Sequence, residues 1–122
     1  MTNSLNSSSP QVIDIDSYSS QIQIYEVGDL CINSRNRSVV WRGKSLKLTA
    51  TEFNLLFVLT QHSGKTVSKS QLSLEALHKP LQKFDRSIDV HIHRLRLKMG
   101  PNADGLAVIQ TIHKQGFQFL IA

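Results

Sequence analysis

The chain has 122 residues, a length typical of one domain, and its 14 Lys and Arg against 9 Asp and Glu give a formal net charge of +5 at pH 7. A single cysteine, Cys31, excludes an intramolecular disulfide and a cysteine-rich zinc site, and no apolar run approaches the ~20 residues of a membrane span or the pattern of a signal peptide. We therefore expect a cytoplasmic protein with no membrane contact. Its charge favours nucleic acid, although simple solubility also explains it.

Residues 1–20 are rich in Ser and Asn and contain two acidic residues but no Lys or Arg. Such a composition cannot bury enough apolar surface to offset the entropy of the chain. We expect a flexible linker or tail here and a folded domain over residues 21–122.

The segment from Gln21 to Leu48 alternates apolar and polar residues with a period of two. That period is typical of strands with one buried face. Arg42 and Gly43 form a tight turn in this segment, because Gly suits a hairpin position with positive φ. We expect about four short antiparallel strands.

Two helices are predicted next. The first begins at Thr49, which has capping-box spacing to Glu52, and it ends near Gly64. The second begins at Ser68, which has the same spacing to Gln71. A connector of residues 78–84 separates it from a third helix.

The third predicted helix, Asp85 to Met99, has two faces on a helical wheel of about 100° per residue. One narrow apolar stripe must face the core and consists of Ile88, Ile92, Leu95 and Met99. The opposite side, called here the outward face, consists of Arg86, Val90, His93, Arg94 and Leu97.

The outward face mixes cations with apolar side chains, which suits the major groove of DNA. Arg can donate two hydrogen bonds to guanine O6 and N7, and Val90 can pack on a thymine methyl group. His91 and Lys98 lie on a flank, where phosphates would run. Taken alone, the helix is explained equally well as a charged amphipathic helix with a solvated face.

Residues 108–121 form two apolar stretches around a turn that contains Gly116, which predicts a β-hairpin. The whole chain therefore predicts an α+β fold: a winged helix-turn-helix with an N-terminal four-stranded antiparallel sheet, three helices and a C-terminal β-hairpin wing.

Four spaced motifs resemble the effector domain of OmpR/PhoB-type response regulators, and the match covers residues 22–121. They are Thr49-x-x-Glu52-Phe53-x-Leu55-Leu56, Gly64-x-x-Val67-Ser68-Lys69-x-x-Leu72, Asp85-Arg86-Ser87-Ile88-Asp89-Val90-His91-Ile92-x-x-Leu95-Arg96-x-Lys98 and Ile109-Gln110-Thr111-Ile112-x-x-x-Gly116-Phe117. Residues 68–96 are most similar to the envelope-stress regulators of this family.

The resemblance implies a bacterial transcription factor whose upstream receiver domain is phosphorylated by a sensor kinase. No receiver is present in these 122 residues, which suggests an excised effector domain, although a naturally short protein fits as well. The family implies a monomer in isolation and a dimer on DNA with tandem half-sites.

The resemblance assigns Arg86 and His91 to phosphates and Val90 and Arg94 to base edges. Arg96 has a second interpretation, because its wheel position beside the core stripe allows a structural pair with an acid such as Glu52. The full predicted DNA-binding set is Lys69, Arg86, Ser87, Val90, His91, His93, Arg94, Arg96, Thr111, His113 and Lys114. The connector matches a loop that contacts RNA polymerase in some members, with candidate residues His78, Lys79, Leu81, Gln82 and Lys83, although an ordinary turn is the alternative.

The wing departs from the family pattern Thr-Val-Arg-Gly-x-Gly-Tyr. His113 replaces the Arg, Lys114 replaces the first Gly, and Phe117 replaces the Tyr. An always-charged Arg suits a narrow minor groove better than a neutral His does, and Lys114 restores the charge one residue later. Contact with the minor groove is therefore expected, with an altered geometry.

The sequence contains no clear motif of a catalytic or metal-binding site. His91 and His93 are about 200° apart on the helical wheel, so they cannot chelate one ion. The chain has neither a His-Glu-x-x-His motif nor a cysteine pair, and Gly64-Lys65-Thr66 lacks the upstream glycine of a phosphate-binding loop. We expect no metal, no cofactor and no enzymatic activity. The alternative to DNA binding is a protein-interaction module that docks an acidic partner or RNA polymerase.

Overall fold

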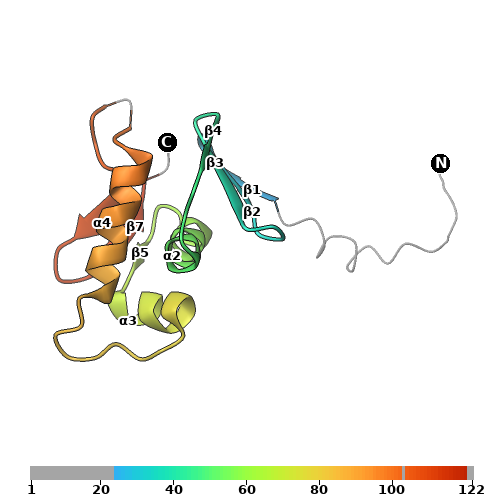
Figure 1. Ribbon diagram of the computed structural model, residues 1–122. Coiled ribbons are helices and arrows are strands. Elements are labelled where there is room, and N and C mark those ends of the chain that lie inside the picture. The colour runs from blue at the N-terminus through green and yellow to red at the C-terminus, as the bar shows by residue number, and fades with distance from the viewer. Residues whose placement is uncertain (1–23, 103, 121–122) are drawn as a thin grey trace, which may run out of the picture.

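A computed structural model of the chain describes residues 24–102 and 104–120. The linker predicted for residues 1–20 lies outside the described residues. The chain begins with a four-stranded antiparallel sheet in the order β1-β2-β3-β4, whose strands are β1 (Ile24–Val27), β2 (Leu30–Asn33), β3 (Ser38–Trp41) and β4 (Lys44–Leu46). Figure 1 shows this sheet on one side of the molecule, with the helices and the second sheet on the other.

Three helical segments follow the sheet. They are α2 (Ala50–Gln61), α3 (Lys69–Leu72) with its continuation η1 (Ser73–Leu77), and α4 (Ser87–Met99). A second sheet has the order β5-β7-β6 and consists of β5 (Thr66–Val67), β6 (Ile109–Ile112) and β7 (Gly116–Phe119). The predicted sheet, three helices and terminal hairpin are confirmed. The two-residue strand β5 was not predicted, because it is too short to show a period.

Local signals in the sequence form the predicted turns and caps. Arg42 and Gly43 have φ values of 51° and 78°, as the tight β3–β4 turn requires. The Thr49 side chain accepts a hydrogen bond from Glu52 N, and the Glu52 side chain accepts one from Thr49 N, so the first capping box is complete. Ser68 accepts from Gln71 N, but the Gln71 side chain contacts His62 instead of returning to Ser68.

The second helix is less regular than predicted. Only Lys69–Leu72 is α-helical, and Ser73–Leu77 widens into a π-helical turn that ends at His78 with a left-handed φ of 59°. The buried Ser73 hydroxyl donates to Lys79 O at 2.7 Å. This bond ties the helix end to the connector that follows it.

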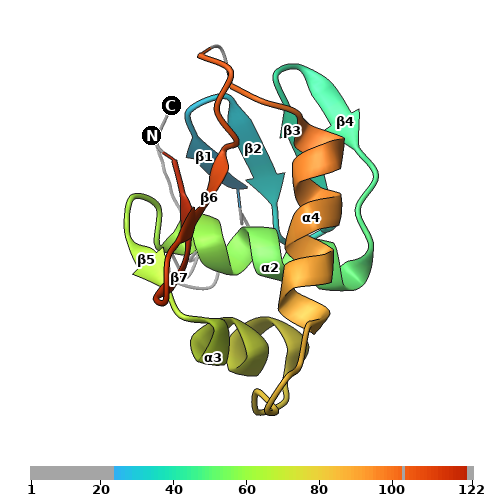
Figure 2. The same cartoon turned by 90° about the vertical axis from the view of Figure 1, so that its left-hand side faces the viewer.

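One hydrophobic core joins the two sheets and the helices. The N-terminal sheet contributes Leu30, Ile32, Val39 and Trp41, whose indole N–H donates to Met99 O at 2.8 Å. This bond fixes the C-terminal end of α4 against β3. In the views of Figures 1 and 2, α4 and the β6–β7 hairpin lie together, on the side of the molecule away from β1–β4. No helix in the described part of the chain is long and apolar enough to cross a membrane.

Candidate nucleic-acid interface

Helix α4 has the two faces predicted from its periodicity. Ile88, Ile92, Leu95 and Met99 are all buried in the core. Val90 is 43% exposed and Leu97 is 70% exposed, and the three basic members of the outward face, Arg86, His93 and Arg94, are exposed as well. The fold therefore leaves the entire outward face available to a partner.

The N-terminus of α4 is held by Asp85, so the helix begins two residues later than predicted. Asp85 Oδ1 accepts a hydrogen bond from Ser87 N at 2.9 Å and another from the Ser87 hydroxyl. These bonds from Ser87, with the nearby charge of Lys79, hold the pKa of Asp85 below its usual value. Ser87, a predicted DNA contact, thus has its hydroxyl hydrogen engaged, whereas Arg86 beside it is exposed.

The predicted wing is the β6–β7 hairpin, with an exposed three-residue turn of His113, Lys114 and Gln115. Lys114 occupies the family glycine position with a φ of 61°, a left-handed conformation that a lysine adopts at some cost. Gly116 has a φ of 150°, and a Cβ atom there would lie 2.0 Å from Val67 O. A glycine at position 116 is therefore required for β7 to lie against the end of β5.

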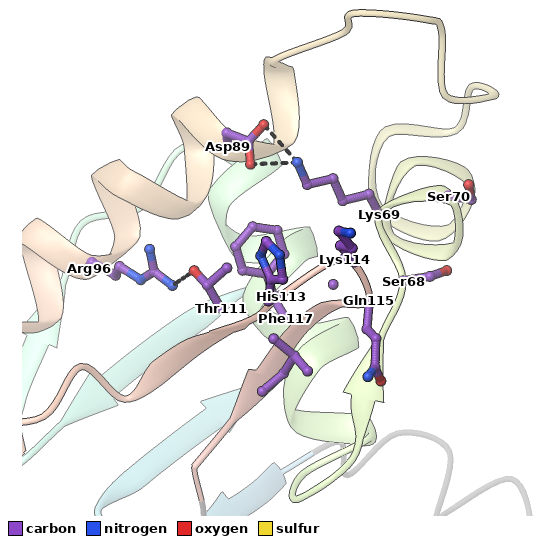
Figure 3. A pocket seen from close by; sticks show the side chains of 12 residues that line it. Ser68, Lys69, Ser70, Asp89, Arg96, Thr111, His113, Lys114, Gln115 and Phe117 are labelled. Atoms are coloured by element: carbon purple, nitrogen blue, oxygen red, sulfur yellow. Dashed lines mark hydrogen bonds and ion pairs between the residues drawn. The ribbon is translucent and has the colours of Figure 1, made fainter.

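An open pocket of about 590 Å³ separates α4 from the wing, and the first residues of α3 form its third side. Within it Lys69 Nζ lies 3.0 Å from Asp89 Oδ1, an ion pair that connects α3 to the first turn of α4 (Figure 3). Lys69 was predicted as a DNA contact. Its ammonium group is at the pocket, but it is already paired with a carboxylate.

Arg96 also lies at this pocket and connects α4 to the wing. Its Nε donates to Ile109 O at 2.8 Å. Its guanidinium also donates to the Thr111 hydroxyl at 2.7 Å, as Figure 3 shows. Burial lowers the pKa of Arg96, and the charge of Asp89 opposes that shift. The structural interpretation of Arg96 is thus favoured, but the predicted partner, Glu52, was wrong.

Glu52 is paired instead with Lys98, on the other flank of α4. The Glu52 side chain is 1% exposed and accepts hydrogen bonds from Lys98 Nζ and Thr49 N. Burial raises the pKa of Glu52, but these two bonds and the charges of Lys98 and His91 together lower it below its usual value. Lys98, expected on a phosphate flank, thus anchors α4 to the start of α2.

His91 is half-buried on the same flank, and its Nδ1 atom is buried with no hydrogen-bond partner within the described residues. His91 is therefore less accessible to a phosphate group than a fully exposed side chain would be. The described residues contain no group of three or more His, Cys, Asp or Glu side chains placed to hold a metal ion.

The connector of residues 78–84 is largely solvent-exposed. Among its candidate contacts Leu81 is half-buried, and the others, His78, Lys79, Gln82 and Lys83, are exposed. Phe84, which sequence reasoning did not single out, is 86% exposed with a left-handed φ of 62°, and Lys83 Nζ lies 5.3 Å from its ring centroid.

Sequence reasoning also missed Asp89 and Phe117 as parts of this interface. Asp89 neutralises Lys69, and the buried Phe117 ring lies 5.7 Å from the Arg96 guanidinium carbon. The wheel places Asp89 and Arg96 on one flank of α4, which was the available signal, but no local pattern identified the wing and α3 as their neighbours.

The comparisons with known proteins agree with this geometry. A family described as "Transcriptional regulatory protein, C terminal" matches residues 43–119. The transcriptional regulatory protein CpxR of Escherichia coli K12 is 41% identical over 97 residues, which cover 80% of this chain and 42% of CpxR. The crystal structure of the DNA-binding domain of E. coli CpxR has a TM-score of 0.74 and 39% identity, covering 81% of this chain and 98% of that one. The chain belongs to the OmpR/PhoB family of winged-helix effector domains.

This membership confirms the resemblance drawn from the four motifs, including the similarity to envelope-stress regulators of the CpxR type, and the family is one of transcription regulators rather than enzymes. The Klebsiella pneumoniae RstA DNA-binding domain, solved in complex with the RstA box, has a TM-score of 0.74 and 30% identity, covering 82% of this chain and 99% of that one. The chain spans less than half the length of the CpxR proteins that it matches.

Proposed function

We propose that the chain binds double-stranded DNA sequence-specifically, as the output domain of a two-component transcription regulator. The observation that carries this proposal is the exposed outward face of α4, which mixes basic with apolar side chains. The wing lies beside this helix (Figure 1). The RstA domain, related at 30% identity, was solved with its DNA box, which supports the same activity here.

In the proposed complex α4 enters the major groove with its outward face toward the bases. Arg94 donates to guanine and Val90 packs on a thymine methyl group. Arg86, at the exposed start of the helix, contacts a phosphate, and His91 does so from the flank. The phosphate strand between the two grooves passes over the open pocket, where Lys69 and Thr111 are held by Asp89 and Arg96.

The wing turn then meets the adjacent minor groove through His113 and Lys114. Arg96 is a positioning residue in this arrangement, because it joins α4 to β6 and so fixes the distance between the two DNA-contacting elements. We further propose tandem half-sites bound by a dimer, and control by a phosphorylatable receiver domain and a sensor kinase in the cytoplasm.

The test is selection of duplexes from a random pool, followed by footprinting to count half-sites. The proposal expects an enriched sequence and an affinity that falls steeply with salt, because neutralised phosphates release their counterions. If no duplex is enriched, or if the affinity does not change with salt, DNA binding is not the function of this domain.

Arg94→Ala and Arg86→Ala are expected to have different effects on the selected duplex. Loss of Arg94 costs about 2 kcal/mol and relaxes base preference at one position, whereas loss of Arg86 weakens all sequences alike and lowers the salt slope by about 1. Fluorescence anisotropy on the selected and point-mutated duplexes measures both effects. Arg35→Ala, in the exposed β2–β3 turn, removes the same charge away from α4 and serves as the control. Identical behaviour of Arg94→Ala and Arg86→Ala would contradict the assignment.

A second candidate function is contact with RNA polymerase through the connector. Phe84 supports this candidate. Its side chain is exposed and its backbone has a positive φ, so the residue contributes little to the stability of the fold and is free to contact a partner. Lys83 beside it adds a positive charge, which suits an acidic protein surface, and Lys79 lies nearby in an ion pair with Asp85.

Phe84→Ala is expected to leave the affinity for the selected duplex unchanged while it weakens retention of RNA polymerase on a promoter complex. A gel-shift assay with purified polymerase measures both quantities. Leu106→Ala, which truncates another half-exposed apolar residue, is the matched control. Equal polymerase retention by Phe84→Ala and Leu106→Ala would remove this second function.

A further inference from the structure

Leu97 is an exposed apolar residue in an unusual place. It lies at the C-terminal end of the outward face, 70% exposed, and its neighbours one turn back are the exposed His93 and Arg94. Full burial of a leucine side chain stabilises a fold by about 1.5–3 kcal/mol. Because Leu97 stays mostly exposed, the domain gains only a small part of this free energy. The fold therefore does not explain why a leucine, and not a further cation, occupies this position.

The surroundings of Leu97 narrow the kind of group that it fits. A position that meets phosphate oxygens favours Arg or Lys, because they donate charge-assisted hydrogen bonds, and a leucine cannot. Within the major groove the one apolar group that a base presents is the C5 methyl of thymine. A leucine on a groove-facing surface therefore has one natural partner among the bases.

The spacing from Val90 adds a geometric constraint. The two residues are seven positions apart, which is two turns and about 10.5 Å along a helix, and both belong to the outward face. Successive bases of one strand are about 3.4 Å apart along the duplex axis. A helix inclined to that axis therefore places the two side chains at most about three base-pair steps apart.

We propose that Leu97 is a second apolar base contact, which packs on the C5 methyl of a thymine within about three base pairs of the thymine that Val90 contacts. The inference rests on the proposed DNA binding and deepens it, because it adds a base preference at a defined distance. Arg94 lies between the two apolar side chains and contacts the bases between them.

Deoxyuridine tests this directly, because it differs from thymidine only in lacking the C5 methyl. Each thymine of the selected duplex is replaced singly, and binding of the 122-residue chain is measured by fluorescence anisotropy. For the parent chain, two positions within about three steps of each other are expected to lose about fourfold in affinity, the equivalent of one methyl group leaving contact. Leu97→Ala should lose the response at one of them and keep it at the other, and Val90→Ala should do the reverse.

Leu74→Ala is the matched control, since Leu74 is a 56% exposed leucine on η1 and not on α4. It should keep both methyl responses, and thermal melting should show that all three variants fold. The proposal is overturned if Leu97→Ala responds to every replacement as the parent does, if it weakens all duplexes equally, or if the selected site lacks two such positions. These results leave specific binding intact, whereas failure to enrich any duplex contradicts the proposed function itself.

Discussion

Replacement of Gly116 by Ala is expected to destabilise the domain by about 3–4 kcal/mol, because the added methyl group overlaps with the backbone of a neighbouring strand. The added Cβ would lie 2.0 Å from Val67 O and 2.8 Å from Ser68 Cα. Both are backbone atoms, so no side chain can rotate to relieve the overlap. The φ of 150° at position 116 adds a backbone conformation that alanine rarely adopts.

Gly116→Ala should also affect DNA binding, because the overlapping atoms join the wing to the segment that leads into α3. Relief of the overlap requires β7 to move away from β5, which shifts the wing turn relative to α4. We therefore expect Gly116→Ala to lose DNA affinity even after correction for the unfolded fraction.

Urea denaturation measures the loss of stability. A second variant, Gly43→Ala, separates the contribution of the positive φ from that of the steric overlap. Gly43 also has a positive φ, 78°, but a Cβ atom there meets nothing within 4 Å. Gly43→Ala should therefore cost only about 1–2 kcal/mol, the left-handed penalty alone. Equal losses in the two variants would show that the close approach to Val67 is not the cause.

Most of the fold was predictable because it is encoded locally. The core stripe of α4, the Thr49–Glu52 capping box and the Arg42–Gly43 turn each depend on residues within one or two turns of each other in the sequence. Hydrophobic periodicity therefore identified which face of α4 is buried and, by elimination, which face is free for a partner.

The connections between elements were not predictable in the same way. On the wheel Arg96 and Lys98 lie at about +80° and −80° from the core stripe, so either one can reach a neighbouring acid. Which flank meets α2 and which meets the wing depends on the packing of the whole domain. Hence Glu52 was paired with the wrong cation, and the Lys69–Asp89 pair was missed.

Phe84 shows a different kind of failure. Hydrophobicity predicts that a phenylalanine is buried, yet this one is 86% exposed. The proposed contact with RNA polymerase gives one reason for this exposure, because the partner that covers the ring lies outside the folded chain. Leu97 is a similar exception, on the face proposed to meet DNA.

Lys98→Met is expected to cost about 3 kcal/mol at pH 7, because it leaves the carboxylate of Glu52 buried without its cation. The estimate is at the low end for a buried pair, since the Lys98 side chain is 37% exposed. Methionine keeps the length and helix propensity of the lysine, so the charge is the main change. Lys44→Met, at an exposed position of strand β4 that has no ion pair with any residue the structure describes, removes an equal charge and should cost little.

The dependence on pH distinguishes lost charge from lost packing. In the parent chain the pKa of Glu52 is lowered below 4.5, so its pair stabilises the domain above about pH 4.5, and this contribution disappears as the pH falls through the lower folded value. Loss of Lys98 removes a hydrogen bond and a charge that lower the pKa of Glu52, so this pKa is higher in the folded variant than in the folded parent. The variant therefore loses less stability than the parent as the pH falls. The difference between parent and variant should therefore be widest at pH 7 and smaller at pH 4. Urea denaturation at both pH values checks this, and an equal difference would mean that Lys98 acts through packing alone.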